Sequence, residues 1–158
     1  RDLHDDIGMV FANQYLPQVL EEAYPDKRQR QIMVTETLHA MVAHDTDVEV
    51  HTVEAGVVRV ADGLDMKKGR ARIGFETGKK DIHNISAMAI EDVRVLKPSE
   101  EKPIRVEIVM DDAAGVFQVD YLLKKKIKGS GIEEHVEVTA KVSKEKGEEH
   151  PIETYRIS

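Results

Sequence analysis

Imidazole and carboxylate side chains, the groups that bind divalent metals, are concentrated in the first part of this sequence. Four of its seven histidines fall there: His4, His39, His44 and His51. Asp62 and Asp65 follow on an apolar stretch, and their i, i+3 spacing places both carboxylates on one helical face. A buried carboxylate needs a partner, so this pair requires a basic side chain, backbone donors or a metal ion.

The segment that carries these aspartates has the form of a known catalytic motif. Residues 58–65 (VRVADGLD) resemble the last motif of the HD superfamily of metal-dependent phosphohydrolases, an apolar helix with Ala-Asp-x-x-Asp. The resemblance implies that Asp62 is a metal ligand. It also implies that Asp65 is a catalytic residue, directed toward the substrate or supporting a ligand.

A second motif of the family is an earlier helix that ends in a histidine. Residues 38–45 (LHAMVAHD) resemble it, and His44 lies eighteen residues before Asp62, a separation common in compact HD domains. The resemblance therefore makes His44 a metal ligand. His39, five residues earlier, is the competing candidate at this position and a candidate catalytic residue.

The start of the chain allows two placements against the family's first motif. Residues 3–8 (LHDDIG) compare with the His-Asp-x-Gly signature, although one extra aspartate turns the following residues by about 100°. Alternatively, residues 1–4 match an Arg-x-x-His segment that follows the His-Asp motif in archaeal members. We favour the second placement because the chain lacks an initiator methionine and an earlier isolated histidine ligand. It makes His4 a metal ligand or phosphate contact and puts the main His-Asp pair upstream.

Further segments extend the resemblance to archaeal HD proteins with a C-terminal α+β domain: residues 69–73, 81–87 and 114–120. The implied activity is hydrolysis of a phosphate ester of a nucleotide or another small molecule. The implied cofactor is a divalent ion (Mn, Ni, Co, Mg, Zn or Fe) that lowers the pKa of bound water. Arg59 and Arg70 are candidates to bind phosphate because guanidinium offers bidentate donors, and Arg72 is a weaker one.

Two other functions remain open at this point. The first is a non-catalytic sensor, in which an HD-like scaffold binds a nucleotide and the C-terminal domain serves assembly. The second is a metal-dependent oxygenase, because some HD folds bind two irons.

Hydrophobic periodicity predicts the elements that position these residues. Helices are expected over residues 7–24, with a kink or junction at Pro17, over 27–43 and over 51–66. Strands are expected around residues 93–95 and over 104–110, 136–142 and 152–157, with a helix over 116–127 between the second and third. The sequence therefore predicts an α+β protein. Residues 1–76 would form the C-terminal part of an all-helical HD-type domain, and residues 77–158 a small β-β-α-β-β domain.

Composition excludes some kinds of site and argues against some kinds of partner. The 158 residues include no cysteine, which excludes disulfides, thiolate metal sites and cysteine nucleophiles. A formal net charge of −7 argues against a protein built to coat nucleic acid or an anionic membrane. The basic run at residues 124–128 reads as the exposed face of an amphipathic helix. Without an apolar run of membrane-spanning length the expected compartment is the cytoplasm, and partly apolar helix faces suggest a homo-oligomer.

Overall fold

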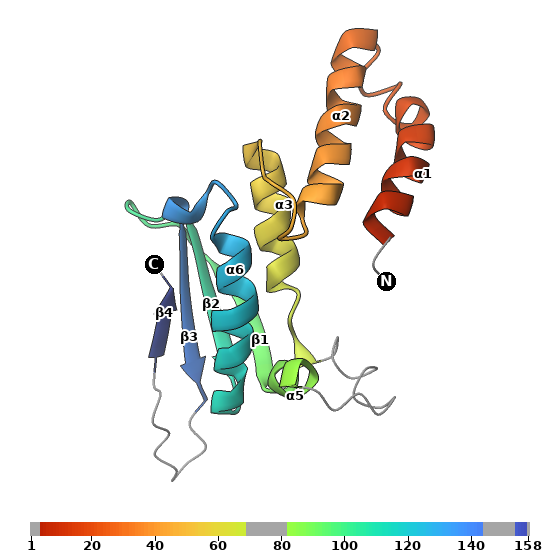
Figure 1. Ribbon diagram of the computed structural model, residues 1–158. Coiled ribbons are helices and arrows are strands. Elements are labelled where there is room, and N and C mark those ends of the chain that lie inside the picture. Colours follow the sequence, from red (N-terminus) through yellow and green to blue (C-terminus); the bar gives the residue numbers. More distant parts are fainter. Residues whose placement is uncertain (1–3, 69–81, 144–153, 158) are drawn as a thin grey trace.

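The computed structural model describes residues 4–68, 82–143 and 154–157. Three helices come first and a sheet with its covering helices follows (Figure 1). The helices are α1 (His4–Val19), α2 (Lys27–Ala43), α3 (Val53–Leu64) and the short α5 (Ile82–Met88). The strands are β1 (Ile90–Leu96), β2 (Ile104–Met110), β3 (Val136–Val142) and β4 (Thr154–Ile157).

The sheet has the strand order β1-β2-β3-β4. The outer pairs are antiparallel, whereas β2 and β3 run parallel with Ile104 opposite Val136 and Met110 opposite Val142. Parallel neighbours need a crossover, and a helical segment supplies it. This segment consists of η1 (Ala113–Gly115), the π-helix η2 (Gln118–Leu123) and α6 (Lys124–Ile127), with η3 (Glu133–His135) just before β3.

The hydrophobic core lies between the crossover helix and the sheet. Alternate residues of β2 and β3 are buried, as expected for strands with one covered face. They share one cluster with residues of the crossover: Val106, Ile108, Met110, Val136, Val138, Ala140, Val119, Leu123 and Ile127. The core thus fixes α6, through Ile127, against the sheet.

Helix α3 packs on this same core. Val60 of α3 and Met66 just beyond it belong to the cluster that includes the strands. The predicted domain boundary, between residues 76 and 77, lies outside the described residues. Helix α3, which the sequence assigned to the helical domain, thus shares a hydrophobic core with the α+β unit.

The mixed α+β class and the strand-strand-helix-strand-strand order are confirmed. Helices α2 and α3 begin where side-chain caps are available. Asp26 accepts a hydrogen bond from the Gln29 backbone N–H at 2.8 Å, and Thr52 accepts one from Ala55 at 3.3 Å. Helix α1 continues through Pro17 and ends at Val19, short of the predicted end. Helix α5 was not predicted from the sequence.

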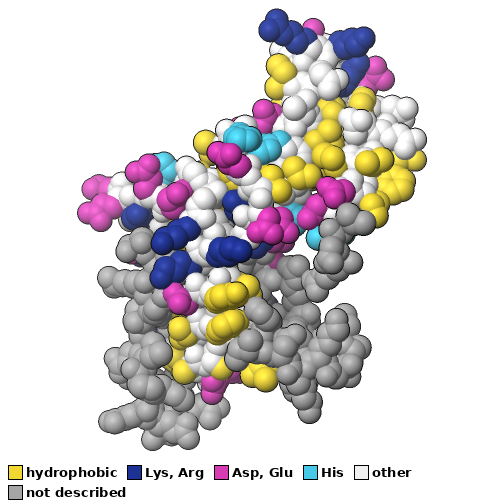
Figure 2. Space-filling model, in the orientation of Figure 1, with side chains coloured by type: hydrophobic (Ala, Val, Ile, Leu, Met, Phe, Trp, Pro, Cys, Tyr) yellow, Lys and Arg dark blue, Asp and Glu magenta, His cyan; other side chains and the backbone are white. Residues whose placement is uncertain are grey.

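Helix α1 leaves its apolar face in water. None of its residues is buried, and large hydrophobic side chains remain exposed on it: Ile7, Val10, Phe11, Tyr15 and Val19. Hydrophobic side chains are visible over the α1 and α2 region of the space-filling view (Figure 2). The predicted homo-oligomer stays a prediction. Among the described residues, no helix is both long enough and apolar enough to cross a membrane.

Gly56 allows α3 to approach the loop after α6. A Cβ at this position would collide with the Ser130 carbonyl oxygen and lie 3.2 Å from its carbon. We expect Gly56→Ala to lower the free energy of unfolding by about 1–3 kcal/mol, despite the higher helix propensity of alanine. Chemical denaturation measures this.

Gly8→Ala in α1 is the matched control. A Cβ there meets only the Met41 Cε at 3.6 Å, an ordinary contact. The same substitution should therefore stabilise the protein by up to about 1 kcal/mol through helix propensity. Equal effects at the two positions would contradict the close approach.

Candidate metal centre

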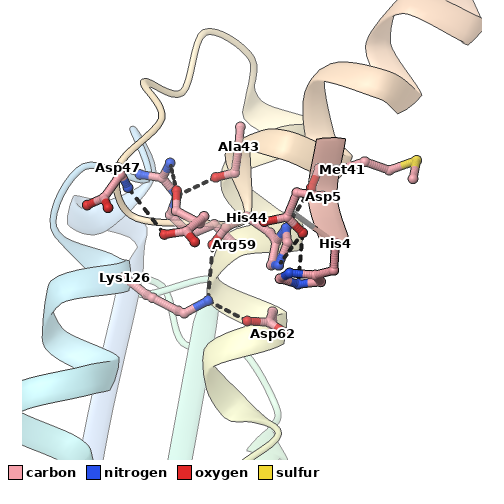
Figure 3. Close-up of polar contacts among 10 residues, drawn as sticks. His4, Asp5, Met41, Ala43, His44, Asp47, Arg59, Asp62 and Lys126 are labelled. Atoms are coloured by element: carbon pink, nitrogen blue, oxygen red, sulfur yellow. Dashed lines mark hydrogen bonds and ion pairs between the residues drawn. The ribbon is translucent and has the colours of Figure 1, made fainter. Parts of the chain in front are cut away.

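Three ligand-type side chains converge where the start of α1 meets the end of α2 (Figure 3). They are His4 and Asp5 from α1 and His44, which caps the C-terminus of α2. One ligand atom from each lies within 4.8 Å of the others. The His4 Nε2 is 2.9 Å and the His44 Nε2 is 3.7 Å from the Asp5 Oδ1. Both imidazoles thus have their Nε2 atoms close to one carboxylate oxygen.

The ring of His44 is held in a form suited to metal binding. Its Nδ1 lies 2.6 Å from the Met41 carbonyl oxygen. A carbonyl can only accept, so the Nδ1 carries the proton and donates it. In the neutral ring the Nε2 lone pair is then available on the side of Asp5. A hydrogen bond of this kind fixes both tautomer and ring orientation in metal-binding histidines.

The site is open on the His4 side. The His4 side chain is 62% exposed, whereas Asp5 and His44 are 22% and 23% exposed. The two rings meet edge to face, with centroids 6.0 Å apart. Two imidazoles and one carboxylate are a suitable donor set for a borderline divalent metal, and three protein ligands leave further positions for water or substrate. The residues present therefore fit a metal ion.

Arg59 holds the chain just beyond α2. It is 3% exposed. Its Nε donates to the Ala43 carbonyl at 2.6 Å, and its two terminal nitrogens donate to three others: Gly129 at 2.9 Å, Asp45 at 2.7 Å and Val48. Burial lowers the pKa of the guanidinium, and the negative charge of Asp45 partly offsets this. The Arg59 guanidinium, which the sequence predicted to bind phosphate, thus donates to four backbone carbonyls. We therefore assign Arg59 a structural role.

Lys126 of α6 binds the carbonyl of His44, the residue between Ala43 and Asp45. Its Nζ donates to the His44 carbonyl at 3.0 Å and forms an ion pair with the Asp62 carboxylate on α3 (Figure 3). Asp62, predicted as a metal ligand, is therefore bound to an ammonium group. The carboxylate grouped with His4 and His44 is that of Asp5.

The other predicted site residues lie elsewhere. The His39 Nε2 accepts the His51 backbone N–H at 3.1 Å, and the two rings stack with centroids 5.3 Å apart. Five residues turn an α-helix by about 140° beyond a full turn, so His39 and His44 face different neighbours. Asp65 caps the C-terminus of α3 and is exposed. Arg70, like Arg72, lies outside the described residues.

Sequence reasoning missed two residues of this region. The sequence contained a signal for Asp5, because this residue follows His4 directly in the segment compared with the His-Asp signature. Lys126 had none, because its partners lie 64 and 82 residues away along the chain.

Comparison with known proteins gives one relative and no activity. The chain is 42% identical over 146 residues to the uncharacterized protein MJ1020 of Methanocaldococcus jannaschii. The matched region is 92% of this chain and 56% of that protein, so the chain spans little more than half of the relative's length. No protein-family model matches the chain. No solved structure matches it either.

Proposed function

We propose that His4, Asp5 and His44 hold a divalent transition-metal ion and that the site hydrolyses a phosphate ester of a nucleotide or another small molecule. The convergence of the three ligand atoms within 4.8 Å carries this proposal. It is supported by the hydrogen bond from the His44 Nδ1 to Met41, which leaves the other ring nitrogen available for a metal.

A bound divalent ion would lower the pKa of a coordinated water and neutralise charge on phosphoryl oxygens. The chain's own residues have separate tasks. Asp5 supplies the negative charge that attracts a cation and helps to hold it. His44 supplies a fixed neutral donor, and the exposed His4 lies where a substrate can approach.

The resemblance to HD phosphohydrolases supports the same reaction class. Adjacent His4 and Asp5 side chains at one site favour the comparison of residues 3–8 with the His-Asp signature. An HD-type architecture for α1 to α3 is part of this proposal.

Two alternatives have an observation in their favour. Two histidines and one carboxylate are also the ligand set of non-haem iron oxygenases, which favours the oxygenase. The pairing of Asp62 with Lys126 favours the non-catalytic nucleotide sensor, because it removes a predicted ligand from the site.

The test begins with elemental analysis of the purified protein after reloading with Mn²⁺, Co²⁺, Ni²⁺ or Fe²⁺. We expect bound metal in the wild type, little in His44→Ala, and phosphate release from at least one nucleotide or small phosphate ester. Dioxygen consumption by the iron-loaded protein would instead identify an oxygenase. Metal or nucleotide binding without turnover would identify a sensor. No metal in the wild type would refute the proposal.

A further inference from the structure

Lys126 is the point at which the α+β unit contacts the segment that carries His44. Its ammonium group lies between the His44 carbonyl, 3.0 Å away, and the Asp62 carboxylate. The side chain is 20% exposed, whereas neighbouring Lys125 is 63% exposed and lies 4.0 Å from Asp47. Adjacent lysines of one helix therefore have different surroundings.

The aliphatic part of Lys126 passes over a glycine. A Cβ at Gly63 would lie 3.0 Å from the Lys126 Cδ and 3.1 Å from the Leu123 Cδ1. Both distances are tighter than ordinary van der Waals contact. The absence of a side chain at position 63 thus gives Lys126 room to reach across α3.

Lys126 completes a set of contacts to the end of α2. The last carbonyls of a helix have no partner within the helix, and cations are favourable there. Three consecutive carbonyls receive donors from distant elements: Ala43 and Asp45 from Arg59, and His44 between them from Lys126. The backbone of the histidine proposed to bind metal is therefore fixed by a side chain of the α+β unit.

We propose that Lys126 is a positioning residue for the metal centre, which holds the His44 backbone and Asp62 in place from the α+β unit. This inference rests on the proposed function. It makes metal affinity depend on a residue that is not itself a ligand. By thermodynamic reciprocity, metal binding should in turn stabilise the packing of α6 against α3 and the contact of Lys126 with the end of α2.

Lys126→Met tests this, because methionine keeps most of the stem and removes the ammonium group. We expect Co²⁺ affinity, measured by isothermal titration calorimetry on the full chain, to fall about 10–100-fold, as when residues that support a ligand are changed. Lys125→Met should stay within about twofold of the wild type, since an exposed and screened charge contributes little.

A general loss of stability could also weaken metal binding, so Ile127→Val serves as a second control. Ile127 is buried on the same helix, and the change should lower the free energy of unfolding by about 0.5–1.5 kcal/mol. If the role of Lys126 is positional, Ile127→Val keeps the wild-type metal affinity. An equal loss of affinity in Ile127→Val and Lys126→Met would overturn the proposal.

A second measurement does not require metal. At about pH 8, where histidine is ordinarily neutral, the ¹⁵N shifts of the His44 ring report its tautomer. We expect the Nδ1–H form in the wild type and in Lys125→Met, and a mixture of tautomers in Lys126→Met. An unchanged tautomer together with unchanged affinity would refute the role of Lys126. If the wild type binds no metal but the tautomer changes, the proposed function fails and the positioning of His44 stands.

Discussion

Asp5→Asn is expected to weaken Mn²⁺ or Co²⁺ binding by more than the roughly 100-fold that changes around a metal's ligands can cost. Asparagine keeps the shape of the side chain and removes its charge. In the structure the Asp5 Oδ1 is the atom near the Nε2 of both His4 and His44. Its loss therefore removes the one anionic ligand of the proposed centre. Calorimetric titration of the metal-free protein measures the change.

Asp6→Asn is the matched control, because it makes the same substitution one residue along α1. Asp6 is exposed and does not belong to the His4, Asp5 and His44 group. Its variant should bind metal within about twofold of the wild type, as expected for a solvent-screened charge. His39→Ala is a second control, on the helix that carries His44, and should also keep its metal. Equal losses at Asp5 and Asp6 would indicate general attraction of cations and no defined site.

Arg59→Met is expected to lower the free energy of unfolding by about 3–5 kcal/mol, the range for breaking a buried charged network. Methionine cannot donate to the four carbonyls that Arg59 holds, and leaving the buried Ala43 carbonyl and the three partly buried ones without this donor is costly. Urea denaturation with linear extrapolation measures the loss. Arg28→Met, at an exposed position of α2, should change stability by less than about 0.5 kcal/mol.

A second substitution, Arg59→Lys, distinguishes the structural role of Arg59 from the phosphate-binding role that the sequence suggested. Lysine keeps a positive charge but cannot reproduce the planar set of donors, so Arg59→Lys should also be strongly destabilised. A phosphate contact would behave differently. It would give Arg59→Lys near-normal stability and a raised KM for the phosphate ester, and that outcome would contradict the role assigned here.

The sequence by itself determined the order of elements. The alternation of apolar residues at 104–110 and 136–142 predicted two strands with one buried face, and both were found at those bounds. Helix α2 occupies its predicted range because a cap at Asp26 follows Pro25. Such signals are local, since caps and periodicity act over a few residues. Helix α5 was missed because seven residues carry too little periodicity.

The sequence also pointed to two of the three side chains that meet between α1 and α2, and the metal site itself stays a prediction. His4 and His44 come together as the predicted set required, and Asp5 stands directly beside His4. The resemblance drew attention to these residue types, but it could not choose between Asp5 and Asp62. That choice depends on which carboxylate faces the end of α2.

Only the tertiary structure decided the roles of the charged residues. Arg59 and Asp62 lie on one helix and carry opposite charges. Each contacts a residue far along the chain: Arg59 donates to the Gly129 carbonyl, and Asp62 pairs with Lys126. Lys126 belongs to a run of lysines that the sequence cannot tell apart. The physical reason is that the crossover between β2 and β3 packs on α3 at Gly56 and Gly63, which brings Lys126 to within 3.0 Å of the His44 carbonyl. Periodicity along a chain does not specify a contact between residues 82 positions apart.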